Sequence, residues 1–414
     1  MAVGGVAYLC PRDGALCPGA FMDDPWEKMC SYGAGGVSCS ECPEAWRFDG
    51  EVCADCESGG TAAGPFILVA LLLVVVLVYL RFTIPALGAD VWTRARLQMM
   101  LGLSVFSACL ACCASLVQTN HVFAQSDLGF PTPVLELFSA PGGAFDLSLF
   151  SLECLKHQDP RTWAVLQTVL LNIGPAFVAA FSAILFALAH TCPRPGRQWP
   201  EETAILGTFL NLFSVFFLTI SDSAINMGFA VRKHPGGQRT LRVFPFLLET
   251  DPEVQVIRVV SIVGVVVWCA GGLAAIAYCL HILPSKANNL YWRRSLLGIT
   301  IRYKHSMPWW CLLLLVKELL VALSVTLFTE GGWQLMYNCA VLIAYFGLLN
   351  ACRPYFCPLC HLADAAGTLG KLFLLISAEG NLRLGRDGSL VLAVAVSAYT
   401  VSGGFVLLSL AVLF

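Results

Sequence analysis

Two apolar runs between Arg302 and Tyr355 constrain this chain more than any other stretch. A basic and aromatic segment leads into the first run, and a break of four residues, 330–333, separates it from the second. Each run is about long enough to cross a bilayer, and so short a break requires the two helices to lie antiparallel. The sequence therefore predicts a membrane hairpin with both ends at one face, where we expect Arg353 to contact Tyr303, Trp309 or nearby carbonyls.

The composition indicates that lipid is the main solvent of the whole chain. Of its 414 residues 57% are hydrophobic and only 13% are charged, whereas a soluble domain carries about a quarter charged residues. A net charge of −2 gives no reason to expect nucleic acid. The sequence contains no Rossmann glycine pattern, P-loop, nucleophile elbow or HExxH. We therefore expect an all-α polytopic membrane protein that is not an enzyme and needs no cofactor or metal.

Nine apolar runs predict about nine transmembrane helices within residues 61–414. They are 65–85, 97–118, 163–190, 203–222, 255–282, 309–328, 333–351, 362–378 and 389–412. Their lengths suit a bilayer if some helices tilt. An odd number of spans places the two termini on opposite sides. Basic residues are nearly balanced between the two sets of loops, so the orientation rests on the cysteine-rich N-terminus.

Residues 1–60 form a separate module that is rich in cysteine, glycine, proline and acidic residues. Its seven cysteines are Cys10, Cys17, Cys30, Cys39, Cys42, Cys53 and Cys56. Two CxxC pairs suit either a zinc site or a disulfide framework, and the short gap between Cys42 and Cys53 together with the additional cysteines favours disulfides. Cross-links are the usual remedy for a segment too small to bury a core. Because seven is odd, Cys154 is the candidate eighth partner, with a free thiol as the alternative.

The ends of the chain suggest that it is a piece of a longer protein. No secretory signal peptide precedes the cysteine module, because the first apolar run begins only at Pro65. The chain also stops at Phe414, inside an apolar run. We therefore expect further sequence upstream or downstream.

One long polar connection, residues 223–254, carries most of the charge that we expect outside the membrane. It contains the basic run VRKHPGGQRTLRVF and ends in the acidic residues Glu249, Asp251 and Glu253. We expect a solvated loop here rather than a ligand site.

Four ionisable residues inside predicted spans are candidates for a functional site, because such residues are costly in lipid. Lys317 and Glu318 are adjacent, and adjacent side chains leave a helix about 100° apart. We therefore expect no tight pair between them. The alternatives are partners on other helices, or an interfacial helix start from which Lys317 snorkels to water. Asp364 and Lys371 share one helix face and either line a cation path or leave Asp364 hydrated near the inner end.

The ends of the membrane hairpin resemble the transmembrane region of TRP-like proteins, the fungal TRP-like and polycystin-related group. The residues that carry this resemblance look architectural: Arg302, Tyr303, Trp309, Trp310, Gln334, Arg353, Pro354 and Tyr355. The cysteine pattern of residues 1–60, with Gly50 in its loop, resembles an ephrin-receptor-like repeat. In the TRP-like family an extracellular domain precedes about nine helices, and the resemblance implies a cation channel or a related transporter.

The expected function is therefore a cation channel subunit with an extracellular sensing module. Glu379 and Asp387, between the last two spans, are the candidates for a cation filter. We expect an oligomer in the plasma or ciliary membrane, with its N-terminus extracellular, its C-terminus cytoplasmic and an extracellular protein or matrix partner for residues 1–60. The alternatives are a non-conducting receptor or structural anchor, and a small-molecule or lipid transporter.

Overall fold

The computed structural model describes most of the helical part of the chain. The described residues are 2–3, 6–7, 39, 46–48, 53–55, 94–125, 130, 134, 160–191, 202–234, 237–286, 289, 292, 295–296, 299–300, 302–384 and 389–413. Within them long helices dominate, and strands occur as three small antiparallel pairs. The pairs are β1 (Ala2–Val3) with β2 (Val6–Ala7), β3 (Trp46–Phe48) with β4 (Cys53–Asp55), and β5 (Val231–Lys233) with β6 (Arg239–Leu241).

The helices cover eight of the nine predicted spans. They are α4 (Arg94–Gln125), α6 (Pro160–Thr191), α7 (Glu202–Phe229), α8 (Pro252–Gly264), η4 (Val265–Gly271), α9 (Gly272–Ile282), α11 (Trp310–Leu327), α12 (Gly331–Cys352), α13 (Pro358–Leu384) and α14 (Ser389–Leu413). The predicted span at 65–85 lies outside the described residues. Among the described residues, five helices are long and apolar enough to cross a membrane. The prediction of an all-α polytopic membrane protein is confirmed to that extent, while the number nine and the N-terminal module stay predictions.

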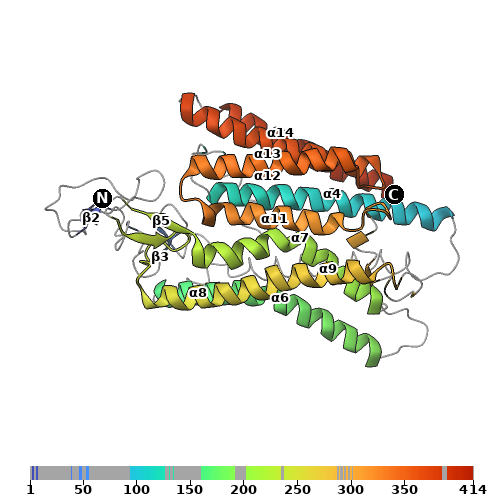
Figure 1. The fold of residues 1–414 in the computed structure, drawn as a ribbon, viewed down its shortest axis with the longest axis horizontal. Helices are drawn as coiled ribbons and strands as arrows, with labels where there is room; N and C mark the ends of the chain where they lie inside the picture. Colours follow the sequence, from blue (N-terminus) through green and yellow to red (C-terminus); the bar gives the residue numbers. More distant parts are fainter. Residues whose placement is uncertain are drawn as a thin grey trace.

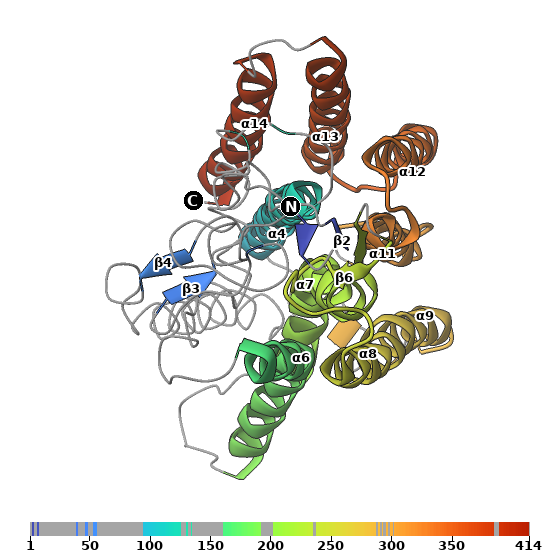
Figure 2. The ribbon, with the colours of Figure 1, turned by 90° about the vertical axis from the view of Figure 1, so that its left-hand side faces the viewer.

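The helices run alongside one another and form one elongated bundle (Figure 1). Seen along the bundle, α4 lies between α7 and the pair α13 and α14 (Figure 2). Its neighbours by contact include α14, α13 and α7, and α7 in turn packs against α11, α8 and α6. Of the five candidate spans, α7 is the most buried and the helix Pro252–Ile282 the least. The core of the bundle therefore follows α4, α7 and α11, with the 252–282 helix at its rim.

Large apolar side chains on the rim helices point away from the protein. On the 252–282 helix Val259, Ile262 and Val266 are exposed, and on α13 Phe373 and Ile376 are exposed. A soluble protein rarely exposes so many large apolar groups together, whereas hydrocarbon solvates them. These faces suit contact with lipid.

The 252–282 helix approaches its neighbours closely at two glycines. A Cβ atom on Gly264 would lie 1.9 Å from Asn172 Oδ1, and one on Gly272 would lie 2.5 Å from the Phe213 ring. Between these glycines the helix widens into the π-helical turns of η4. There Trp268 Nε1 donates a hydrogen bond to the backbone oxygen of Asn172, at 2.8 Å. The absence of side chains at both glycines thus allows this helix to pack tightly on α6 and α7.

The predicted membrane hairpin is present, and its two ends meet. Lys304 N donates to Pro354 O at 2.8 Å, and Phe356 N donates to Arg302 O at 3.1 Å. The rings of Tyr303 and Tyr355 stack with their centroids 5.3 Å apart. Arg353 is exposed and takes a left-handed backbone conformation with φ of 47°. The expected brace therefore forms through backbone groups and tyrosine rings, with the Arg353 side chain turned outward.

Residues 230–251 form a folded β-hairpin cap, so the expectation of a simple solvated loop is wrong. Strands β5 and β6 pair with Val231 opposite Leu241. Leu241 and Leu247 are fully buried in an apolar cluster to which α6 contributes Ala164 and α8 contributes Ile257. The cap lies at the end of the bundle where α7 ends and α8 begins, and the 302–309 and 353–357 segments lie at the opposite end (Figure 1).

Candidate functional site

Lys317 and Glu318 on α11 form a direct ion pair in the middle of the bundle. Lys317 Nζ lies 2.8 Å from Glu318 Oε1, and the two side chains are 5% and 4% exposed. The expectation that adjacent residues cannot pair is therefore wrong. Helix geometry separates their Cβ atoms, but both side chains have several rotatable bonds and bend toward each other. The burial of Lys317 also excludes the interpretation that its ammonium snorkels to water.

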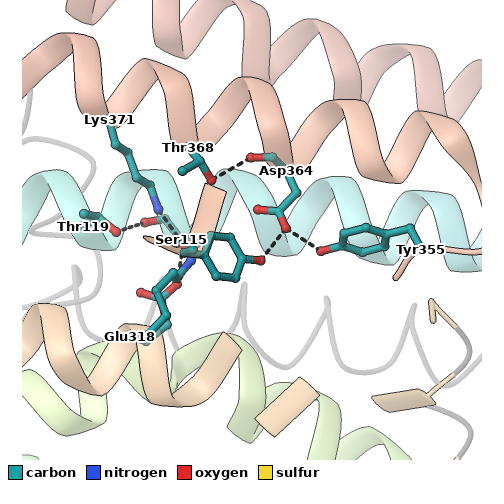
Figure 3. A network of polar contacts seen from close by, with 9 residues as sticks. Ser115, Thr119, Glu318, Tyr355, Asp364, Thr368 and Lys371 are labelled. Atoms are coloured by element: carbon teal, nitrogen blue, oxygen red, sulfur yellow. Dashed lines mark hydrogen bonds and ion pairs between the residues drawn. The ribbon is translucent and has the colours of Figure 1, made fainter. Parts of the chain in front are cut away.

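Ser115 on α4 joins this ion pair to a second lysine (Figure 3). Its hydroxyl donates to Glu318 Oε1 at 2.7 Å and accepts from Lys371 Nζ on α13 at 2.8 Å. Thr119, one turn along α4, donates to the backbone oxygen of Ser115 at 2.6 Å. One serine hydroxyl therefore links α11 to α13 through α4.

Asp364 on α13 is held by two tyrosines (Figure 3). The Tyr345 hydroxyl, from α12, donates to Asp364 Oδ2 at 2.5 Å, and the Tyr355 hydroxyl donates to the same oxygen at 2.8 Å. Asp364 is 7% exposed, so the alternative that it is hydrated at the inner end is wrong. Lys317 Nζ lies 4.5 Å from the centroid of the Tyr345 ring, which places the Asp364 group next to the Lys317–Glu318 pair.

These contacts define one buried charged network on α4, α11, α12 and α13 and on the segment that joins α12 to α13. Its members are Ser115, Thr119, Lys317, Glu318, Tyr345, Tyr355, Asp364, Thr368 and Lys371. Two lysines balance two carboxylates, but within the described residues only one pair is in direct contact. Hydroxyl groups make the other links. Glu318 Oε2 is buried and accepts no hydrogen bond from the described residues, so one carboxylate oxygen can still bind a proton or a hydrogen-bond donor.

Arg302 adds a third buried cation, toward the Tyr303 end of the bundle. Its Nη2 donates to Asn211 Oδ1 on α7. The residue is 6% exposed. Nearby, burial raises the pKa values of both Tyr303 and Tyr355, and the charge of Asp364 raises them further. Tyr355 therefore stays a neutral hydroxyl that can donate to Asp364.

The remaining predicted pore residues lie away from this network or outside the described part. Glu379, eight residues beyond Lys371, is half-buried near the far end of α13, and Asp387 lies outside the described residues. The structure thus brings together four of the six candidates. Sequence reasoning missed Ser115 and Tyr345, because a serine or tyrosine in an apolar run gives no signal of its own.

The residues that resemble TRP-like proteins surround the network at its Tyr303 end or serve helix ends. Trp310 is fully buried with its ring 5.9 Å from that of Tyr345, whereas Trp309 is 44% exposed. Gln334 Nε2 donates to the backbone oxygen of Phe328 at 2.6 Å and so satisfies a carbonyl group after the end of α11. Their positions suit architectural roles.

The N-terminal cysteines are mostly outside what the structure describes. Cys39 is disulfide-bonded. The other candidates lie outside the described side chains: Cys10, Cys17, Cys30, Cys42, Cys53, Cys56 and Cys154. The disulfide framework as a whole therefore stays a prediction. Among the described residues no group of three or more His, Cys, Asp or Glu side chains is placed to hold a metal ion.

No protein-family model, no curated protein and no solved structure matches this chain. The resemblances to TRP-like proteins and to the ephrin-receptor-like repeat therefore stay predictions. The class of protein rests on the fold and on the site. It is an integral membrane protein in which a helical bundle encloses a network of charged side chains.

Proposed function

We propose that this protein transports ions across a membrane and that the buried charged network controls that transport. The observation that carries the proposal is the burial of Lys317, Glu318, Asp364 and Lys371 within the helical bundle. Charged groups inside a membrane are expensive and commonly mark ion pathways, proton relays or gates. For stability alone, well-packed apolar residues serve as well as a buried ion pair.

Within this proposal we assign the network the role of a gate that holds helices together. Its charges are held by one ion pair and by hydroxyl groups, so in this conformation they offer no row of free ligands to a passing ion. A change that separates Lys371 from Ser115 would release α13 from α4 and α11. The conducted ion in our proposal is a cation, as the TRP-like resemblance implies, with Glu379 and Asp387 as the filter carboxylates.

A small-molecule or lipid transporter driven by protons is the second candidate. The observation that favours it is Glu318 Oε2, which is buried without a hydrogen-bond donor among the described residues. A carboxylate that takes up a proton there would lose its attraction to Lys317. Such a coupling of protonation to helix packing is what an ion-coupled carrier requires.

The cellular setting belongs to the same proposal. We place the protein in the plasma or ciliary membrane as an oligomer, with residues 1–60 outside and the C-terminus in the cytoplasm. A sensing module outside the cell would transmit ligand binding or force to the bundle. A non-conducting receptor or structural anchor is the outcome if no transport is measured.

Reconstitution of the full chain in planar bilayers tests the proposal. We expect cation-selective currents that change at least severalfold in Glu318→Gln and Lys371→Met. The matched control is Ser377→Ala, because Ser377 is half-buried on α13 and its hydroxyl makes a solvent-exposed hydrogen bond within its own helix, to Phe373 O. Silent bilayers with intact, folded protein would overturn the channel assignment. Proton-dependent solute uptake without current would support the transporter assignment. If neither current nor uptake is measured, the protein is a receptor or a structural anchor.

A further inference from the structure

The β-hairpin cap carries a concentrated positive surface. We define the basic hairpin surface as Arg232, Lys233, Arg239 and Arg242. The pairing of β5 with β6 sets Lys233 directly opposite Arg239, and both residues are exposed. Like charges in directly opposed positions destabilise a strand pair unless an anion lies nearby.

The acidic residues of the cap mainly contact cations outside this surface. No Asp or Glu occurs in residues 230–248. Glu249 lies 2.6 Å from Arg258 and 3.8 Å from Arg239, so its charge is shared with a cation on α8. Asp251 lies 3.8 Å from Arg161 on α6 and also accepts from Leu248 N. Among the described residues Arg239 therefore shares its carboxylate with Arg258, and Lys233 forms no ion pair with these acids.

The same chain contains a segment of the opposite charge. Residues 1–60 hold ten acidic residues against three basic ones, although the whole chain has a net charge of only −2. The strands described in that segment, β2 and β3, lie at the same end of the bundle as β5 (Figure 1). Because the segment is tethered to the bundle, its effective concentration at the hairpin is on the order of millimolar.

We propose that the acidic N-terminal segment, residues 1–60, docks on the basic hairpin surface of the same chain. The contact would neutralise Lys233 and Arg239 and seat the segment over the junction between α7 and α8. A pull or a ligand acting on residues 1–60 would then reach the 252–282 helix through a folded hairpin. The contact follows from charge and position, and it is independent of whether the protein conducts ions.

Carbodiimide coupling of the full chain in neutral detergent tests the contact, because this reagent joins a lysine amine to a carboxylate only when the two groups touch. We expect an amide between Lys233 and an acidic residue of 1–60 in the peptide mass spectrum at low salt. The yield should fall at least severalfold in about 0.5 M salt, where screening shortens the reach of surface charges to a few ångströms. Lys304, exposed at the opposite end, should give no such product and is the internal control.

Charge reversal elsewhere on the surface sharpens the test while Lys233 remains as the reporter. Arg232→Glu with Arg242→Glu should reduce the Lys233 product about fivefold or more, whereas Lys286→Glu with Lys304→Glu should leave it unchanged. The milder pair Arg232→Gln with Arg242→Gln should give an intermediate reduction, which guards against misfolding of the reversed variant.

Three results would overturn the proposal. The first is no product between Lys233 and residues 1–60 at low salt. The second is a product found only between isotopically labelled and unlabelled copies, which would assign the surface to a second chain. The third is a product that vesicles rich in phosphatidylserine abolish, which would assign the surface to anionic lipid headgroups.

Discussion

Glu318 on α11 and Lys371 on α13 meet through a single hydroxyl, that of Ser115 on α4, which lies 2.7 Å from Glu318 Oε1 and 2.8 Å from Lys371 Nζ. Opposite charges on two helices are thus joined by a group that can both donate and accept. Since Lys317 contacts the same carboxylate oxygen, both lysines depend on Glu318. We therefore expect the stability of the bundle to depend on the Ser115 hydroxyl.

Removal of that hydroxyl should loosen the contact of α4 with α11 and α13. Ser115→Ala leaves Lys371 Nζ without its acceptor in a buried site, and an unsatisfied buried polar group costs about 1–3 kcal/mol. We expect a thermal unfolding temperature several degrees lower in detergent. Ser377→Ala is the control, and equal shifts in the two variants would show that the Ser115 link contributes nothing specific.

Neutralising the shared carboxylate should have a larger effect. Glu318→Gln leaves Lys317 buried without a counter-charge, and breaking a buried ion pair in this way destabilises by about 3–5 kcal/mol. The double variant Glu318→Gln with Lys317→Met should recover part of that loss, because no unpaired charge remains. Unfolding by a denaturing detergent, measured for both single variants and the double, gives the coupling energy. Strictly additive losses would contradict direct coupling between the two residues.

The four charged residues were each identifiable from the sequence, but their convergence was not. An ionisable residue in an apolar run is visible by itself, whereas Ser115 lies 203 residues from Glu318 and 256 from Lys371. The prediction that Lys317 and Glu318 do not pair was wrong because helix geometry sets only the directions of their Cβ atoms. Both side chains are long and flexible enough to bring their charged groups together.

The helices could be predicted from local sequence, whereas the β-hairpin cap depends on residues that are distant in the sequence. Continuous apolar runs predicted the helices well, since each run determines its own helix in lipid. The β-hairpin cap was missed because its core needs Ala164 from α6 and Ile257 from α8. Its own apolar residues, Leu241, Phe244, Phe246 and Leu247, follow no alternating strand pattern and so did not indicate a core by themselves.

Tyr355 predicts a loss of stability in alkaline solution. Burial raises the pKa of its phenol above the ordinary value of 10.0, and Asp364 raises it further. Above about pH 10 the unfolded chain releases this proton while the folded chain keeps it, so stability falls as pH rises. Tyr355→Phe should make the fall between pH 9 and 11 less steep, and thermal unfolding at several pH values measures it. An unchanged slope in the variant would exclude Tyr355 as a contributor.

His234 predicts the opposite dependence for the β-hairpin cap. Its Nε2 lies 2.8 Å from Thr240 Oγ1, and burial lowers its pKa, with a further lowering from the charge of Arg232. Below about pH 6.5, the ordinary value for histidine, the opened cap takes up a proton more readily than the closed cap. The stability present above that pH is therefore lost as the pH falls. Hydrogen-exchange protection of the cap amides should decrease from pH 7.5 to 5, and His234→Gln should remove most of that decrease.

Substitution of Gly264 should destabilise the bundle, because the Asn172 side chain lies very close to this residue. Gly264→Ala would put its methyl group 1.9 Å from Asn172 Oδ1, so either the Asn172 side chain or the helix backbone must move. Movement of the helix would also strain the hydrogen bond from Trp268 Nε1 to the backbone oxygen of Asn172. We expect destabilisation by about 1–3 kcal/mol, seen as a lower unfolding temperature and a changed Trp268 fluorescence.

Gly347→Ala in α12 is the matched control, because a Cβ there meets nothing within 4 Å and alanine favours a helix by about 1 kcal/mol over glycine. Equal stability of the two variants would mean that the 252–282 helix is free to shift against α6.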